Sequence, residues 1–311
     1  MEPLCSEEIR GNWATLLAPF DEDERIDYAR LAAEIDVLVS LRVDGIYANG
    51  TTGEFYNQTE DEFDRISGLL AERCNTHGVP FQIGVSHMSA RVSLERLRRV
   101  LPLRPGAVQV ILPDWVPVTD DEAIAFLQRM GETASPIGLV LYNPPHAKRV
   151  LRPEDIGRLK AAVPSLVGVK VADGDTDWYA AMRRHAAGLS VFVPGHRLAT
   201  GYTLGAHGAY SNVACLDPLG AQRWYDQMEA DIDAALELEG RIRAFMDAHI
   251  LPFIAEQGYS CQAVDRLMAL IGDWADIGAR LRWPYKSIPP SEADRLRPIA
   301  RAMLPEILTQ G

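Results

Sequence analysis

Residues 138–171 read GLVLYNPPHAKRVLRPEDIGRLKAAVPSLVGVKV, and this stretch decides the fold. Two short apolar runs, Gly138–Tyr142 and Leu166–Val171, flank a segment at 153–163 in which Pro153 suits the first position of a helix. Two parallel strands need a long crossover between them, usually a helix, because a tight turn cannot join them. The stretch therefore predicts a strand–helix–strand unit in a parallel sheet.

Strand-like and helix-like segments alternate in the same way on both sides of this unit. The other strand candidates are Trp13–Leu17, Gly45–Ala48, Phe81–Val85, Val108–Leu112, Val191–Val193 and Gly208–Ser211. The helix candidates between the strands lie near 27–41, 58–75, 89–101, 120–134, 175–187 and 197–205. Eight such units over about 220 residues fit a closed barrel better than an open sheet. We therefore predict an α/β fold, a (β/α)8 TIM barrel.

The pattern changes after residue 216, where only helix candidates follow. They lie at 218–247, 249–256, 260–272 and 291–309, and Trp283-Pro284 and Pro289-Pro290 interrupt them. We expect a barrel over residues 10–216 and a C-terminal helical extension over 217–311 that packs on the barrel.

The composition is that of an ordinary globular protein, with 47% hydrophobic and 24% charged residues among 311. A net charge of −12 argues against binding to nucleic acid or to anionic membranes. No apolar window approaches the length of a membrane span or a signal peptide. The four cysteines, Cys5, Cys74, Cys215 and Cys261, show no paired spacing, so we expect reduced thiols and a cytoplasmic location.

Lys170 is the first candidate for chemistry, in a chain with only four lysines. An ammonium on a buried strand is costly unless it is paired or neutral, and a neutral lysine is a nucleophile. Side chains alternate between the two faces of a strand, so Lys170 shares its face with Gly168 and opposes three valines. Those valines, Val167, Val169 and Val171, would face the helices and turn Lys170 into the barrel. The alternative is a lysine held in a structural ion pair at the end of a strand.

Two polar segments also follow predicted strands, where barrel enzymes carry their catalytic groups. The loop Gly50–Glu54 (GTTGE) can direct backbone N–H groups and two hydroxyls at a carboxylate, or it can be a simple tight turn. Tyr142 offers a phenol for proton transfer, although tyrosines at strand ends also serve in packing. Asp173 and Asp175, after Lys170, are expected to cap the next helix.

These segments resemble the three signatures of the dihydrodipicolinate synthase / N-acetylneuraminate lyase family. The matching residues are Gly50-Thr51-Thr52-Gly53-Glu54, Tyr142-Asn143-x-Pro145 and Gly168-Val169-Lys170, with Ala18-Pro19-Phe20 and Gly205-x-x-Gly208-Ala209-x-Ser211 also in place. The resemblance runs from about residue 10 to 308 and is less clear after 260.

The resemblance implies a class I aldolase or dehydratase. Lys170 would form a Schiff base with a 2-oxo acid such as pyruvate, and Tyr142 would relay protons. Thr51 and Thr52 would bind the carboxylate of that acid. Gly50 of the same loop would also bind the substrate. So would Tyr210, which lies in the matched segment at the eighth predicted strand. It also implies no metal, no organic cofactor and a homo-oligomer, a dimer or tetramer.

Departures from the family pattern bear on the substrate. Dihydrodipicolinate synthases place an arginine five residues after the motif tyrosine, where this chain has Ala147, and a tyrosine where it has Trp115. Sialic acid lyases carry acidic residues after the seventh strand, where this chain has His196 and Arg197. A cationic pair there would favour a substrate with a distal anionic group, unless Arg197 points to solvent.

We therefore expect a Schiff-base lyase or aldolase that cleaves or dehydrates a hydroxylated 2-oxo acid. The alternatives are a true 4-hydroxy-tetrahydrodipicolinate synthase using pyruvate and aspartate semialdehyde, or a 2-oxo acid-binding barrel without turnover. A metal-dependent barrel aldolase using His87, His146 and His196 is a further alternative.

Overall fold

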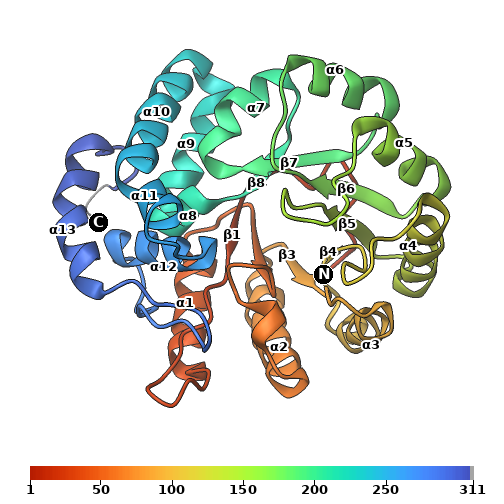
Figure 1. Cartoon of the computed structure of the whole chain (residues 1–311), viewed down its shortest axis with the longest axis horizontal. Helices are drawn as coiled ribbons and strands as arrows, with labels where there is room; N and C mark the ends of the chain where they lie inside the picture. The colour runs from red at the N-terminus through yellow and green to blue at the C-terminus, as the bar shows by residue number, and fades with distance from the viewer. Residues whose placement is uncertain (309–311) are drawn as a thin grey trace.

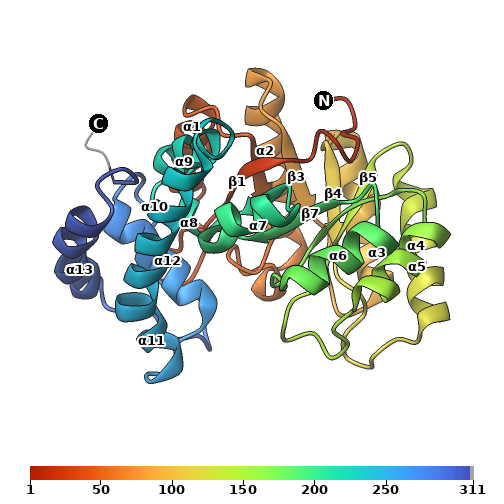
Figure 2. The same ribbon diagram turned by 90° about the horizontal axis from the view of Figure 1, so that it is seen from above.

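A closed barrel of eight parallel strands forms the centre of the protein (Figures 1 and 2). The structure, a computed structural model, describes residues 1–308. The strands, paired in chain order, are β1 Gly11–Thr15, β2 Gly45–Ala48, β3 Phe81–Gly84, β4 Ala107–Val110, β5 Gly138–Tyr142, β6 Leu166–Lys170, β7 Ser190–Pro194 and β8 Gly208–Tyr210. The predicted TIM barrel is confirmed.

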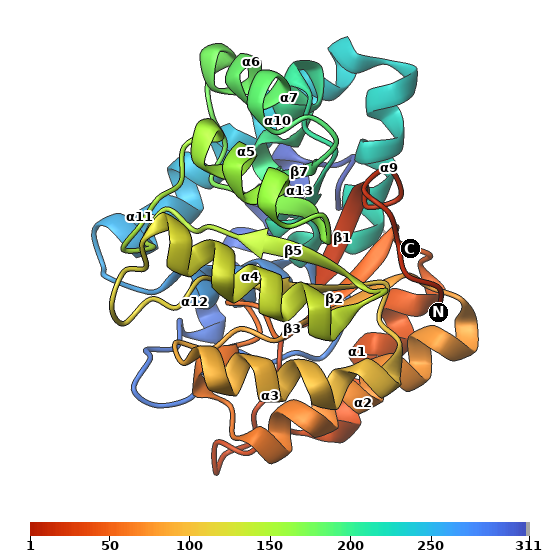
Figure 3. The same cartoon turned by 90° about the vertical axis from the view of Figure 1, so that its right-hand side faces the viewer.

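A helix follows each strand, and these helices surround the barrel; α3 to α6 form the wall that faces the viewer in Figure 3. Their bounds are α1 Tyr28–Ser40, α2 Glu60–His77, α3 Ala90–Val100, α4 Asp120–Ala134, α5 Pro153–Ala162, α6 Thr176–His185, α7 Leu198–Leu204 and α8 Asn212–Leu216. Local signals explain several starts. Thr59 and Thr119 each form a capping box with a glutamate three residues later, and Asp175 caps α6 as predicted.

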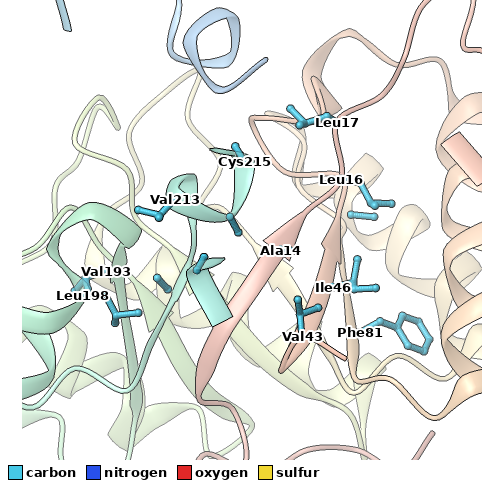
Figure 4. Packing of buried hydrophobic residues seen from close by; sticks show 14 of the residues in the cluster. Ala14, Leu16, Leu17, Val43, Ile46, Phe81, Val193, Leu198, Val213 and Cys215 are labelled. Atoms are coloured by element: carbon cyan, nitrogen blue, oxygen red, sulfur yellow. The ribbon is translucent and has the colours of Figure 1, made fainter. Parts of the chain in front are cut away.

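The barrel has an outer and an inner core. Outside, aliphatic side chains of the strands pack against the helices, as Val193 of β7 does near Leu198 of α7 in Figure 4. Inside, the aromatic rings of Trp13, Tyr47, Phe192 and Tyr210 fill the barrel and contact one another edge to face or tilted. This inner layer closes the barrel beneath its C-terminal mouth.

The C-terminal helices gather beside the barrel, on the side away from α3 to α6 (Figure 2). They are α9 Pro218–Ala230, α10 Ile232–Phe245, α11 Leu251–Ala255, α12 Cys261–Gly272 and α13 Pro290–Met303. The single helix predicted at 218–247 is wrong, because Asp231 leaves helical geometry and its carboxylate caps α10. The expected extension ends at residue 311, and residues 309–311 lie outside the described part.

The strand predictions at β1, β4 and β6 also need correction. β4 ends at Val110, two residues before its predicted end. β1 ends at Thr15, two residues before the predicted end, because the N–H of Leu17 donates to the Glu34 carboxylate at 2.8 Å instead of joining the sheet. In β6, Leu166 and Gly168 face the consecutive residues Leu139 and Val140 of β5. The extra residue, Val167, is bulged and packs against the inner core, so it does not face the helices as predicted.

No helix within residues 1–308 is both long and apolar enough to cross a membrane.

Candidate active site

Lys170 and Tyr142 lie side by side at the C-terminal end of the barrel. They are register partners at the ends of β6 and β5. The Lys170 Nζ lies 4.3 Å from the centre of the Tyr142 ring and 5.3 Å from that of Tyr210. A Cβ at Gly168, two residues before the lysine, would lie 3.3 Å from the Ser190 carbonyl oxygen and 3.4 Å from the Val140 side chain. Within residues 1–308, no group accepts a hydrogen bond from the ammonium or lies in an ion pair with it.

The surroundings of Lys170 favour the neutral amine. Burial lowers the pKa of Lys170 to about 8, and only the more distant Asp265 and Cys215 oppose that shift. At pH 7.5 a pKa of about 8 leaves about a quarter of the amine neutral, against about one part in a thousand for the ordinary 10.5. The site therefore supplies a nucleophilic amine at neutral pH.

The Gly50–Glu54 loop brings two hydroxyls to Tyr142 and Asp265, the groups that act on this amine. Burial raises the pKa of Tyr142 to about 12, and the nearby Thr51 hydroxyl opposes that shift, so the phenol stays protonated. The Thr52 hydroxyl donates to the Asp265 carboxylate at 2.7 Å. Gly50 is required by space, because a Cβ there would lie 2.4 Å from the ring of Tyr47. The loop thus has a fixed backbone with its hydroxyls on the site side.

A buried arginine ties this loop to the C-terminal helix α12. The Arg266 guanidinium is 3.7 Å from the Glu54 carboxylate and donates to the carbonyl of Ala18 at 2.9 Å. Both charged side chains are about 1% exposed. Because Asp265 precedes Arg266 on α12, this contact places the Asp265 carboxyl beside Thr52. A residue of the predicted extension therefore belongs to the site.

Tyr210 forms the floor of the site. Its hydroxyl donates to the side-chain oxygen of Gln82 at 2.5 Å, and its ring is buried against Tyr47 and Phe192. The ring faces Lys170, while the hydroxyl is occupied inside the barrel. Burial raises the pKa of this phenol, which keeps it neutral.

His196 and Arg197 have protein partners. Arg197 lies 3.7 Å from the carboxylate of Asp173, and its side chain is 44% exposed. The His196 ring contacts the side-chain amide of Asn212 at 2.9 Å. Asp173, expected as a helix cap, instead accepts from the hydroxyl of Tyr179 at 2.8 Å.

A pocket opens next to Thr51 and Tyr142, between the loops that follow β4 and β5. Its apolar walls include Phe55, Ile111, Leu112, Pro113, Pro117 and Val118. Ala147 lies on its edge, and the Arg149 guanidinium is occupied by the Val118 carbonyl and the Asp120 carboxylate. Trp115, next to this pocket in sequence, is 73% exposed, and the Lys148 Nζ lies 4.9 Å above its ring.

The comparisons with known proteins agree with this architecture. The family model described as "Dihydrodipicolinate synthetase family" matches residues 8–302. The chain belongs to this family.

Individual relatives are more distant. The chain is 34% identical over 55% of its length to a 4-hydroxy-tetrahydrodipicolinate synthase of Exiguobacterium and spans 58% of that protein. It is 27% identical to a protein of the same name from Thermomicrobium roseum (93% of this chain, 92% of the relative). An N-acetylneuraminate lyase of Rhizobium meliloti is also 27% identical (65% of this chain, 67% of the relative). Among solved structures, YagE of Escherichia coli K12 in complex with pyruvate has a TM-score of 0.81 at 19% identity, covering 95% of this chain and 98% of YagE.

As a member of the dihydrodipicolinate synthetase family, the chain is an enzyme, a lyase of the class I aldolase type. The names of its relatives differ between a synthase and a lyase, so membership fixes the class of chemistry and leaves the substrate open.

The three histidines of the metal-aldolase alternative have separate surroundings. His87 accepts from the N–H of Ser89, His196 contacts Asn212, and His146 lines the apolar pocket. Among residues 1–308, no group of three or more His, Cys, Asp or Glu side chains could hold a metal ion.

Sequence reasoning missed Asp265 and Arg266. The helix at 260–272 was expected, yet its two charged residues lie within the run Ala263–Ile271, which is otherwise apolar. An acidic–basic pair inside an apolar helix is a signal that could have pointed to a buried polar contact. The residues that it contacts lie more than 200 positions away, and no local pattern identifies them.

Replacement of Arg266 tests the tie between α12 and the loop. Arg266→Met leaves the buried Glu54 carboxylate without its cation, so we expect a loss of roughly 3–5 kcal/mol in the free energy of unfolding. Urea denaturation measures it. Arg295→Met, which removes an exposed pair with Glu292 on α13, is the matched control and should cost less than about 1 kcal/mol. Equal, small losses in both variants would contradict the role of Arg266.

Proposed function

We propose that this lyase forms a Schiff base between Lys170 and a 2-oxo acid such as pyruvate, and that it cleaves or dehydrates a hydroxylated 2-oxo acid. The observation that carries the proposal is the Lys170 amine, which has a lowered pKa and no direct ion-pair partner within residues 1–308. Tyr142 lies beside it, and Thr51 acts on the Tyr142 phenol, so the two hydroxyls offer a route for protons.

The proposed reaction needs only groups that the site offers. The neutral amine attacks the ketone carbon, and loss of water gives a protonated imine. When a 4-hydroxy-2-oxo acid is bound, its hydroxyl loses a proton, the C3–C4 bond breaks, and the electron pair moves into the imine to give an enamine and an aldehyde. Protonation at C3 and hydrolysis release pyruvate and the free lysine. In the dehydration branch, an enamine formed by loss of a C3 proton instead expels the C4 hydroxyl as water.

Thr51 and Thr52, with the backbone of Gly50, are proposed to bind the carboxylate of the oxo acid. Their contacts support this, because Thr51 acts on Tyr142 and Thr52 binds Asp265, and both of these groups act on Lys170. A carboxylate adjoins the carbonyl carbon that the amine attacks. Tyr142 is proposed as the proton relay, acting as a neutral phenol. YagE, which shares this fold, is described in complex with pyruvate, and that likeness supports pyruvate as the oxo acid.

The pocket between the loops that follow β4 and β5, with its partly apolar walls, supports an uncharged second fragment. Ala147 offers no charge there, and the guanidinium of Arg149 is already paired with Asp120. Arg197, proposed from the sequence as an anion-binding residue, is paired with Asp173. Because both guanidinium groups already have acidic partners, binding of a substrate with a distal carboxylate, inferred from His196 and Arg197, is less favourable than binding of an apolar aldehyde fragment.

A homo-oligomer, a dimer or tetramer, remains our proposal for the assembly. Exposed apolar residues lie on the loops after β3, β4 and β5: Met88, Trp115, Val116 and Val150. Exposed apolar side chains that gather on neighbouring loops favour burial against another copy.

Borohydride trapping tests the Schiff base. Incubation with pyruvate and borohydride should add the mass of reduced pyruvate to the peptide that carries Lys170, measured by mass spectrometry, because only an imine is reduced to a stable amine. Lys170→Arg should abolish the adduct while the protein remains folded.

Lys160→Arg is the matched control for this trap. Lys160 is also half-buried, and its Nζ donates to the carbonyl of Leu166 at the other end of β6, at 2.7 Å. This variant should keep the adduct. An unmodified Lys170 peptide across a panel of 2-oxo acids would contradict the proposal.

Turnover of pyruvate with aspartate semialdehyde tests the synthase alternative. We expect little turnover, because the arginine that lines the pocket, Arg149, is already paired with Asp120 and is not free to bind the semialdehyde carboxylate. Ala147→Arg should lower KM for the semialdehyde about ten- to a hundredfold, since a hydrogen bond between charged groups contributes about 1.5–3 kcal/mol. Fast turnover by the unaltered protein would instead favour the synthase reading.

A further inference from the structure

The charge of Asp265 opposes the lowering of the Lys170 pKa by burial. Asp265 comes from α12, in the C-terminal helices, and accepts the Thr52 hydroxyl at 2.7 Å. Arg266 holds this part of α12 against Ala18 and the Gly50–Glu54 loop, so the carboxyl is fixed in the site.

The contact with Asp265 conflicts with the binding of a carboxylate by Thr52. A threonine hydroxyl has one proton to donate. While Asp265 is ionised, that proton is directed at Asp265 and is withheld from a substrate carboxylate. A second carboxylate placed beside an ionised Asp265 in this half-buried site would also be repelled.

We propose that Asp265 is a positioning residue that takes up one proton when a 2-oxo acid binds. As a neutral acid it donates its own hydrogen to the Thr52 oxygen, which releases the Thr52 hydroxyl for the substrate carboxylate. As a carboxylate it stabilises the Lys170 ammonium in the empty site. This inference rests on the proposed function of Lys170 and the threonines.

The groups around Asp265 make the proton uptake feasible near neutral pH. Burial raises the pKa of Asp265 to about 6, opposed by the Thr52 hydrogen bond and the Lys170 ammonium. The other titratable groups whose pKa responds to Asp265 are Tyr142 of β5, Cys261 of α12 and Cys215 of α8, each shifted toward its neutral form. Among the described residues, Lys170 is thus the cation that stabilises the carboxylate.

The sign of the pH dependence follows from this arrangement. Because the bound state prefers the protonated acid, pyruvate affinity should be highest below the free-state pKa of about 6 and should fall as the pH rises above it. Between about pH 5.5 and about pH 7.0 the Kd should rise about eightfold. Lys170, with a pKa of about 8, changes little over that window.

Calorimetric titration with pyruvate tests the inference on the whole protein. Titrations in two buffers of different ionisation enthalpy should show uptake of most of one proton near pH 6.5. In Asp265→Asn, which keeps the size of the side chain and does not titrate, uptake should fall well below half of that value, and Kd should change about twofold or less over the same pH window.

Asp273→Asn is the matched control, since it removes the same charge from the exposed C-terminal cap of the same helix. It should retain the eightfold change and the proton uptake. A flat Kd in the unaltered protein, or an unchanged pH dependence in Asp265→Asn, would overturn the inference. If a borohydride adduct still forms on Lys170 in that case, the proposed function survives; if no adduct forms and pyruvate does not bind, both fall.

Discussion

The proposed chemistry of this protein depends on the placement of one amine in a region of low polarity. Lys170 lies on an aromatic floor, beside the Tyr142 ring, and has no direct ion-pair partner within residues 1–308. A salt bridge would restore its ordinary pKa, and full exposure would do the same. Neither occurs here. The Tyr210 hydroxyl is directed to Gln82 inside the barrel, and Asp265, the acid that stabilises the ammonium, forms no direct ion pair with it.

A second constraint sets the mouth of the barrel. The Arg266 guanidinium is buried between α12 and the loops that follow β1 and β2, and it faces the Glu54 carboxylate of the threonine loop. The C-terminal helices are therefore part of the active-site wall and bring Asp265 to Thr52. Glu54, a residue of the family signature, has a structural role here. Its carboxylate pairs with Arg266 and holds the loop, and its side chain does not line the pocket.

Local sequence patterns predicted the elements whose shape is set locally. The runs Gly45–Ala48 and Gly138–Tyr142 form strands at the predicted residues, because apolar and β-branched side chains suit a buried parallel strand. Lys170 and Tyr142 were brought together as expected, since parallel strands in one barrel end at one face. The strand positions follow from periodicity along the chain, and the meeting of Lys170 with Tyr142 follows from strand order.

The failures come from contacts between distant residues. The bulge at Val167 reflects register with β5, which a single strand cannot encode. The pairing of Arg197 with Asp173 and of Asp265 with Thr52 depends on how loops and helices meet in space. Asp231 is a residue type that commonly caps helices, yet the apolar pattern on both sides of it is typical of one long helix.

The pKa of Lys170 is the most direct test of the whole arrangement. The chain has only four lysines, so a protein carrying lysine labelled with a heavy nitrogen isotope gives a simple NMR spectrum, and Lys170→Arg identifies the resonance. We predict a titration midpoint near pH 8 for that side-chain nitrogen. A midpoint close to the ordinary lysine value of 10.5 would show that the amine is charged at neutral pH and would contradict its role as a nucleophile.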